Sequence, residues 1–157
     1  MKGLLLALAL ALAVSVQAQA AFAACSEGAV DVRMGDTSVR FVVEIADTVD
    51  ERAVGLMNRE SMPQFDGMLF VYDSPRPVAF WMKNTLIPLD MLFADASGTV
   101  QRIHQNATPR SLESIPGGDD IQFVLEINGG LSAMLGLAPG AELRHPAIGE
   151  GAAWPCS

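Results

Sequence analysis

The residues of this chain with the widest chemical repertoire lie in one stretch, from Phe80 to Asp90, with the sequence FWMKNTLIPLD. It combines aromatic rings, a thioether, an ammonium, an amide, a hydroxyl and a carboxylate. Lys83 is the only lysine besides Lys2, and every other basic residue is an arginine. A lysine offers a compact, flexible charge whose pKa responds to burial, whereas arginine stays charged. We therefore expect Lys83 to belong to a binding site; the alternative is a surface lysine beside buried apolar neighbours.

A polar cleft around the FWMKN segment is the site that this pattern favours. Two cations, Arg59 and Lys83, next to carboxylates and an amide would suit an anionic or hydroxyl-rich small molecule. The alternative is structural ion pairing, of Lys83 with Asp90 and of Arg59 with Glu126. The residues expected to form the ligand-binding cleft are Met57, Arg59, Trp81, Met82, Lys83, Asn84, Asp90 and Glu126.

Three other functions stay open for the same residues. Asp90 and Glu126 could be the acid and base of a carbohydrate-directed hydrolase, although the sequence has no G-x-S-x-G, H-E-x-x-H or Gly-rich phosphate motif. Phe80 and Trp81 could form a docking patch. Thioethers could bind Cu(I), or simply fill the core; the candidates for copper are Met57, Met62, Met68, Met82, Met91, Trp81 and His104. We expect no cofactor and leave enzymatic activity undecided.

The N-terminal segment has the features of a secretory signal peptide. Lys2 supplies the charged start, residues 4–16 form an apolar run, and Ala21-Phe22-Ala23 matches an A-x-A cleavage site. The run is too short for a typical membrane span. We expect residues 1–24 to be removed, which leaves 25–157 as a single domain in the periplasm or outside the cell.

Two cysteines, Cys25 and Cys156, lie at the two ends of the expected mature chain. In an oxidising compartment we expect a disulfide between them. The alternative is a lipid anchor on Cys25, for which Phe22 is a poor match to the usual aliphatic residue.

The charge of the chain limits its partners. Eighteen acidic residues against ten basic ones give a formal net charge of −8, and no basic cluster is present. Nucleic acids and anionic lipids require basic surfaces, so we exclude both. We expect a monomer that binds a small polar ligand or a cell-envelope component.

The pattern of apolar residues predicts the elements that position these side chains. Period-2 alternation predicts strands over 39–45 and 121–127, and the apolar run Met68 to Tyr72 predicts a strand buried on both faces. Thr48 and Glu51 have the spacing of a capping box, and Gly55 allows close approach to a neighbour. Other strands are expected over 29–33, 78–83, 89–93, 99–106 and 141–145, helices over 47–58 and 131–135 (the second capped by Asn128), a turn over 73–77 and a mobile loop over 107–120. We predict a mainly β, β-rich α+β fold, a compact antiparallel barrel-like sheet with two short helices packed on it.

Four blocks of the sequence resemble one known family. They are GLMNR from Gly55, GMLF from Gly67, FWMKNTLIPLD from Phe80 and VLEINGG from Val124. Together they resemble the family called domain of unknown function 192, over about residues 30–146. The resemblance implies a small, single-domain, β-rich fold, often exported, in bacterial and archaeal proteins. It implies no activity, because none is assigned to the family.

Overall fold

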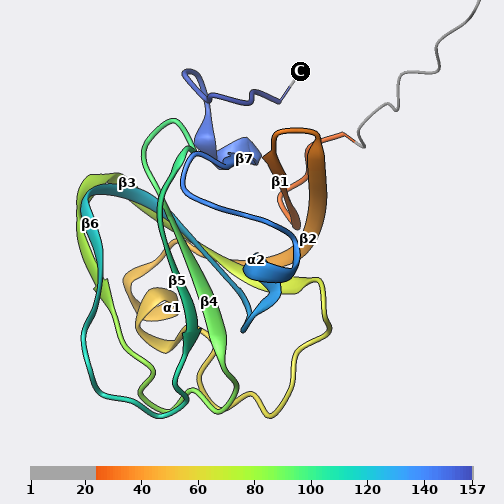
Figure 1. Cartoon of the computed structure of the whole chain (residues 1–157). Helices are drawn as coiled ribbons and strands as arrows, with labels where there is room; N and C mark the ends of the chain where they lie inside the picture. The colour runs from red at the N-terminus through yellow and green to blue at the C-terminus, as the bar shows by residue number, and fades with distance from the viewer. Residues whose placement is uncertain (1–23, 157) are drawn as a thin grey trace, which may run out of the picture.

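The computed structural model describes residues 24–156, which fold around one seven-stranded, curled sheet (Figure 1). The predicted signal peptide lies almost entirely outside these residues. In the described part of the chain, no helix has the length and apolar character needed to cross a membrane. The elements in chain order are β1 (Ala29–Met34), β2 (Thr37–Ala46), α1 (Val49–Val54), β3 (Asp66–Phe80), β4 (Leu89–Ala94), β5 (Val100–Ala107), β6 (Ile115–Asn128), α2 (Leu131–Met134), β7 (Glu142–Arg144) and the 3-10 turn η1 (Pro146–Ile148).

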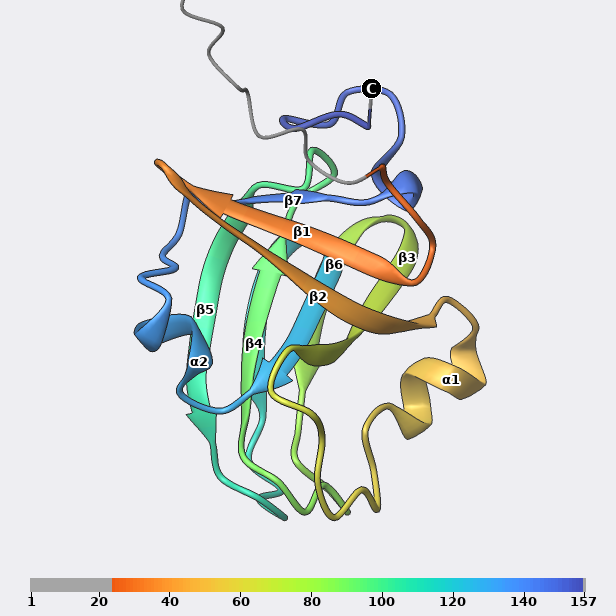
Figure 2. The same cartoon turned by 90° about the vertical axis from the view of Figure 1, so that its right-hand side faces the viewer.

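The sheet has the strand order β5-β4-β6-β3-β2-β1-β7 and curls into a half-barrel. All neighbouring strands are antiparallel except β2 and β3, which are parallel and connected through α1. The two ends of the sheet meet near β7, where Thr99 pairs with Glu142. Figure 2 shows β1, β2 and β7 crossing in front of β4, β5 and β6. The predicted β-rich, barrel-like fold with two short helices is therefore confirmed.

The long strands β3 and β6 replace two segments that the sequence predicted to be irregular. The expected turn over 73–77 lies within β3, and the expected mobile loop over 107–120 contributes its last residues to β6. The register between these strands shifts between Val71 and Arg76 and again before Ala79. Proline removes a hydrogen-bond donor, and such interruptions in a ladder accommodate it. The two prolines of β3 therefore lie where the register shifts, and they do not end the strand.

Both faces of the central strands are buried in apolar clusters. The paired residues Leu69, Leu125 and Leu92 face a cluster that also holds residues of β1, β2, β7 and α2. Their chain neighbours Phe70 and Val124 face the opposite way, toward a second cluster beneath α1. This arrangement confirms the prediction that residues 68–72 are covered on both faces, because successive side chains of a strand point to opposite faces.

The helix α1 begins with the predicted capping box. The Glu51 backbone N donates to Thr48 Oγ1 (3.2 Å), and the Thr48 backbone N donates to Glu51 Oε2 (3.0 Å). The helix is shorter than the expected 47–58 because Gly55, with φ of 50°, ends it. A Cβ at Gly55 would lie 3.1 Å from the Phe70 ring, so the close approach expected at this glycine is present.

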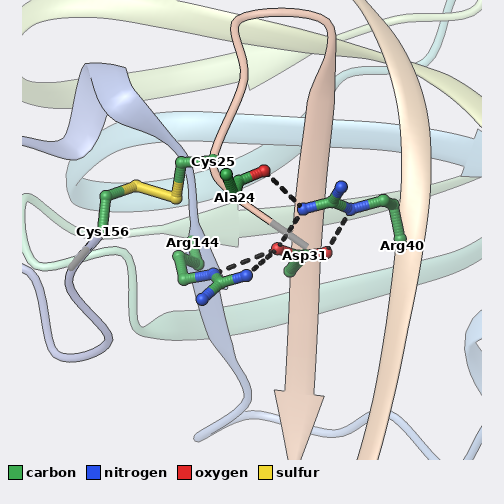
Figure 3. A network of polar contacts seen from close by, with 6 residues as sticks. All are labelled: Ala24, Cys25, Asp31, Arg40, Arg144 and Cys156. Atoms are coloured by element: carbon green, nitrogen blue, oxygen red, sulfur yellow. Dashed lines mark hydrogen bonds and ion pairs between the residues drawn. A yellow bond between two sulfur atoms is a disulfide. The ribbon is translucent and has the colours of Figure 1, made fainter. Parts of the chain in front are cut away.

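The two ends of the described chain are tied together beside β1 (Figure 3). Cys25 and Cys156 form a disulfide, as predicted, so the structure has no free thiol at Cys25 for a lipid. Nearby, Asp31 accepts hydrogen bonds from Arg40 Nε (2.7 Å) and Arg144 Nη2 (2.6 Å). Burial alone would raise the pKa of Asp31, but these hydrogen bonds and charges outweigh it and lower the pKa. The carboxylate thus links β1 to its two neighbouring strands.

Candidate functional site

A pocket of about 200 Å³ lies between α1 and β3. Aromatic side chains form much of its wall, and its polar and apolar surfaces are about equal. The residues after the helix provide Leu56 and Met57, and Thr85 and Glu126 add polar groups. The aromatic residues that line it are Phe70, Tyr72, Phe80 and Trp81.

Glu126 is the buried acid of this pocket. On β6 it is paired with Met68 of β3 and with Met91 of β4, so the three side chains share one face of the sheet. Glu126 is only 4% exposed, and within residues 24–156 its carboxyl group has no hydrogen bond or ion pair. Desolvation by burial raises the pKa of Glu126 to about 8. At neutral pH the side chain is therefore mostly a neutral carboxylic acid.

Cationic side chains lie on the aromatic rings around the pocket. The Lys83 Nζ is 5.0 Å from the centroid of the Trp81 ring, and Trp81 itself is 49% exposed. The Arg52 guanidinium is 4.9 Å from the centroid of Tyr72. Its Nη1 also donates to the backbone oxygens of Asp47 and Val71. Arg52 is thereby fixed at the edge of the pocket, against α1 and β3.

Comparison with known proteins identifies the family. The model of DUF192, a family described as uncharacterised, matches residues 30–145. The chain belongs to the DUF192 family. No curated protein matches this DUF192 chain.

Two solved structures resemble this DUF192 protein closely. A protein of unknown function from Novosphingobium aromaticivorans DSM 12444 is 39% identical, with a TM-score of 0.71, over 73% of this chain and 82% of that one. A "putative transcription regulator" from Sinorhizobium meliloti 1021 is 37% identical, with a TM-score of 0.75, over 81% of this chain and 99% of that one. Both share the fold, and neither assigns an activity to this chain.

The structure brings some of the predicted site residues of the DUF192 chain together. Met57, Trp81 and Glu126 line the pocket. Asn84 lies next to it, with Nδ2 3.9 Å from the Met57 sulfur, and its backbone oxygen accepts a hydrogen bond from the Asn58 N (2.8 Å). The segment after α1 is therefore held against the FWMKN segment.

Met82 and Lys83 lie close by without lining the pocket. Met82 is fully buried in the core beneath α1, and its backbone N donates to the Ser111 oxygen (3.0 Å). Lys83 is exposed over Trp81. The alternating side chains of the FWMKN segment therefore divide it into a buried part and an exposed part.

Asp90 is not part of the pocket, which corrects the expected cleft. It precedes Met91 on β4, so its side chain points to the face opposite Glu126. There it is fully buried and accepts hydrogen bonds from the backbone N of Asn106, Gly130 and Ser132, each at 2.8 Å, and from Ser132 Oγ at 2.6 Å. The expected pairing of Lys83 with Asp90 is wrong, because Asp90 anchors the start of α2.

The expected capping of α2 by Asn128 is also wrong. The cap position is Gly130, and the Asn128 Nδ2 donates instead to the Pro63 oxygen (2.8 Å). Asp90, from a neighbouring strand, takes the role that the sequence assigned to Asn128.

Arg59 has a different partner from the one expected. Its Nη2 lies 2.6 Å from Glu44 Oε2 on β2, and the second nitrogen contacts Oε1. The hydrogen bonds from Arg59 lower the pKa of Glu44. Arg59 therefore does not pair with Glu126, and the pair lies outside the pocket.

The methionines proposed for copper mostly belong to the core. Met68, Met82 and Met91 are buried in the cluster beneath α1, Met62 packs against it, and of the five only Met57 lines the pocket. His104 lies on β5, paired with Met91. Within residues 24–156 no group of three or more His, Cys, Asp or Glu could hold a metal ion. This arrangement agrees with methionine as a filler of the core.

Among the pocket residues that the sequence did not indicate are Arg52, Phe70, Tyr72 and Thr85. Tyr72 was assigned to the end of a strand before a turn, so no site was expected there. The usable signal was the spacing of Phe70 and Tyr72, because residues two apart on a strand share a face. Thr85 gave no signal besides its place within the FWMKNTLIPLD block.

Proposed function

We propose that this DUF192 protein binds a small molecule in the pocket between α1 and β3, with Glu126 as its polar anchor. The observation that carries the proposal is the carboxyl group of Glu126, which lines a pocket and has no hydrogen bond or ion pair within residues 24–156. No fully buried side-chain polar atom of these residues lacks a partner, so the unpaired oxygens of Glu126 face the pocket. A ligand that supplies the missing partner gives a reason for placing an acid there.

The composition of the walls supports the same function. Small-molecule sites are concave and mostly apolar, with a few polar groups that orient the ligand. The pocket is concave, and its aromatic walls surround Arg52, Thr85 and Glu126, so it is more polar than most such sites. Its volume of about 200 Å³ suits a ligand of the size of a metabolite fragment rather than a polymer.

The hydrolase alternative has little support from this arrangement. A glycosidase needs two carboxyl groups on either side of one bond. The side chains of Asp90 and Glu126 point to opposite faces of the sheet, so both cannot contact one substrate. We therefore propose binding rather than hydrolysis.

We also propose that the protein works in an oxidising compartment outside the cytoplasm. The disulfide between Cys25 and Cys156 supports this location, because such bonds persist in exported proteins. The signal-peptide pattern in the sequence points in the same direction.

The binding proposal is tested by NMR of the protein labelled with 13C at the methionine methyl groups. Amines, alcohols, amides and carboxylic acids of fragment size are added at millimolar concentration. We expect at least one class to shift the Met57 signal, which reports on the pocket, and to leave that of Met134 unchanged. Met134 is exposed on α2, on the other side of the molecule (Figure 2).

A pair of variants identifies the site of binding. Ala53→Trp places a large ring on the α1 wall of the pocket, whereas Ala133→Trp places the same ring on α2. Both alanines are exposed, so neither change should unfold the protein. Only Ala53→Trp should abolish the Met57 shift. If no fragment class moves Met57, or both variants bind equally well, the proposal fails.

A further inference from the structure

We infer that the ligand of this pocket is a small organic ammonium ion, held by its charge between the aromatic walls and the carboxylate of Glu126. This inference rests on the proposed binding function and specifies the chemistry of the ligand. It differs from the anionic or hydroxyl-rich ligand expected from the sequence, because the residues expected to bind an anion lie elsewhere.

The polar groups in the pocket favour a ligand that donates hydrogen bonds. Glu126, once ionised, has only acceptor atoms. Thr85 Oγ1 donates its own proton toward the Lys83 backbone oxygen (3.4 Å), which leaves its lone pairs as acceptors. An ammonium group has three N–H donors and no acceptor, so it matches both residues. An anion would face the carboxyl group of Glu126, and Glu44 holds Arg59 outside the pocket. Arg52 does line the pocket, but its Nη1 already donates to the backbone oxygens of Asp47 and Val71.

The aromatic walls add a second attraction for a cation. Four aromatic side chains line the pocket, and cations bind to the faces of such rings at about 6 Å or less. The protein's own cations lie on two of these rings, Lys83 Nζ at 5.0 Å from the centroid of Trp81 and Arg52 at 4.9 Å from that of Tyr72, so a ligand cation competes with them there. The net charge of −8 also attracts cations to the molecule.

Ligand binding would release the proton of Glu126. The neutral acid and the ammonium ion form an ion pair, and one proton goes to solvent, so atoms and charge balance. The other titratable or charged groups near the site are Arg52 on α1, Tyr72 and Arg76 on β3, Lys83 after β3, and His104, which Met91 separates from Glu126. Burial raises the pKa of Tyr72, so its phenol stays neutral at neutral pH. Proton release that is lost in Glu126→Gln therefore reports on Glu126.

The experiment is calorimetric titration with benzylammonium, benzyl alcohol and benzoate, which share the ring and differ in charge. We expect benzylammonium to bind most tightly, with an affinity that rises by about tenfold per pH unit below the pKa of Glu126. In Glu126→Gln the side chain keeps its shape but cannot ionise, so benzylammonium should bind more than about tenfold more weakly and without this pH dependence. A dependence that survives in Glu126→Gln would come from another group and would contradict the inference.

The remaining outcomes separate this inference from the proposed function. If benzyl alcohol binds best and weakens as pH rises, the ligand accepts a hydrogen bond from the protonated acid, and only the inference fails. Tightest binding of benzoate overturns it as well. If none of the three probes binds and no fragment shifts Met57, the binding function fails too.

Trp81→Leu is a second variant, which keeps Glu126. It should weaken the binding of benzylammonium more than that of benzyl alcohol. An equal loss of affinity for both probes would count against a cation on the rings.

Discussion

At the residue scale, Glu126 and Asp90 are buried acids on neighbouring strands with opposite surroundings. The carboxylate of Asp90 has four hydrogen-bond donors, whereas the carboxyl group of Glu126 has no partner within the described residues. A buried carboxylate whose oxygens all accept hydrogen bonds is typical of a residue that stabilises the fold. A buried acid without a partner is typical of a binding or catalytic site. The two residues should therefore respond to mutation in opposite ways.

For Asp90→Ala we expect a loss of about 3 to 5 kcal/mol in the free energy of unfolding, because the buried donors at the start of α2 lose their acceptor. Urea denaturation followed by circular dichroism measures the loss. Asp73→Ala removes an exposed carboxylate and should change the stability by less than about 0.5 kcal/mol. Equal stability of the two variants would show that Asp90 does not anchor α2.

For Glu126 we expect stability that falls as pH rises. Burial raises the pKa of the folded state to about 8 from an ordinary value of 4.5. Between these values the unfolded chain has released the proton and the folded chain retains it. The free energy of unfolding should then decrease by up to about 1.4 kcal/mol per pH unit, with no contribution from this group below the lower value.

The matching measurement compares the wild type with Glu126→Gln by urea denaturation from pH 5 to pH 8, roughly the window that linkage defines. Glutamine does not ionise, so the variant should gain stability relative to the wild type as pH rises. The lowered pKa values of Asp31 and Glu44 affect stability only at more acidic pH, and both proteins share them. Parallel pH profiles would contradict a raised pKa at Glu126.

The sequence predicted which residue types belong to the site better than it predicted the face of the sheet to which each side chain points. Met57, Trp81 and Glu126 were selected correctly as neighbours, because each is chemically distinctive within or near a recognisable block. Asp90 was assigned to the same cleft because strand pairing was unknown. The register that places Met91, and not Asp90, opposite Glu126 depends on contacts between distant strands. A single sequence does not specify them.

At the scale of elements, α1 forms one wall of the pocket, and Gly55, which ends the helix, lies against Phe70. The predicted capping box was confirmed because Thr48 and Glu51 interact locally. The length of α1 could not be predicted, since it depends on the contact of Gly55 with Phe70 on another strand. The extent of β3 could not be predicted either. Its prolines predicted a turn over 73–77, but pairing with the distant strand β6 keeps β3 continuous through this segment.

For Gly55→Ala we expect a loss of roughly 2 to 3 kcal/mol in stability, from the positive φ and from the new methyl group against the Phe70 ring. Gly136→Ala is the control, because Gly136 has a positive φ of 67° but no atom within 4 Å of the added Cβ. The difference between the two variants in chemical denaturation isolates the contact. If they lose equal stability, close packing of α1 on Phe70 is not what requires this glycine.

At the scale of the whole molecule, the ends of the chain hold together the strands that cross over the central sheet. The disulfide joins residues 131 positions apart, and Asp31 links β1 to Arg40 on β2 and to Arg144 on β7 (Figure 3). The pairing of the cysteines could be predicted because the chain has only two. The Asp31 network could not, because its partners come from opposite ends of the sequence.

For the double variant Cys25→Ser, Cys156→Ser we expect a folded protein that is less stable by about 4 to 5 kcal/mol, because the unfolded chain is no longer restricted by the cross-link. The hydrogen bonds of β1 with β2 and β7 remain, so the sheet should persist. Guanidinium denaturation should show a lower midpoint and a slope at least as steep as in the wild type, since the open unfolded chain exposes more surface. Reductant should convert the wild type to the same behaviour and leave the variant unchanged. A midpoint equal to that of the oxidised wild type would mean that the sheet, and not the disulfide, holds the ends of the chain in place.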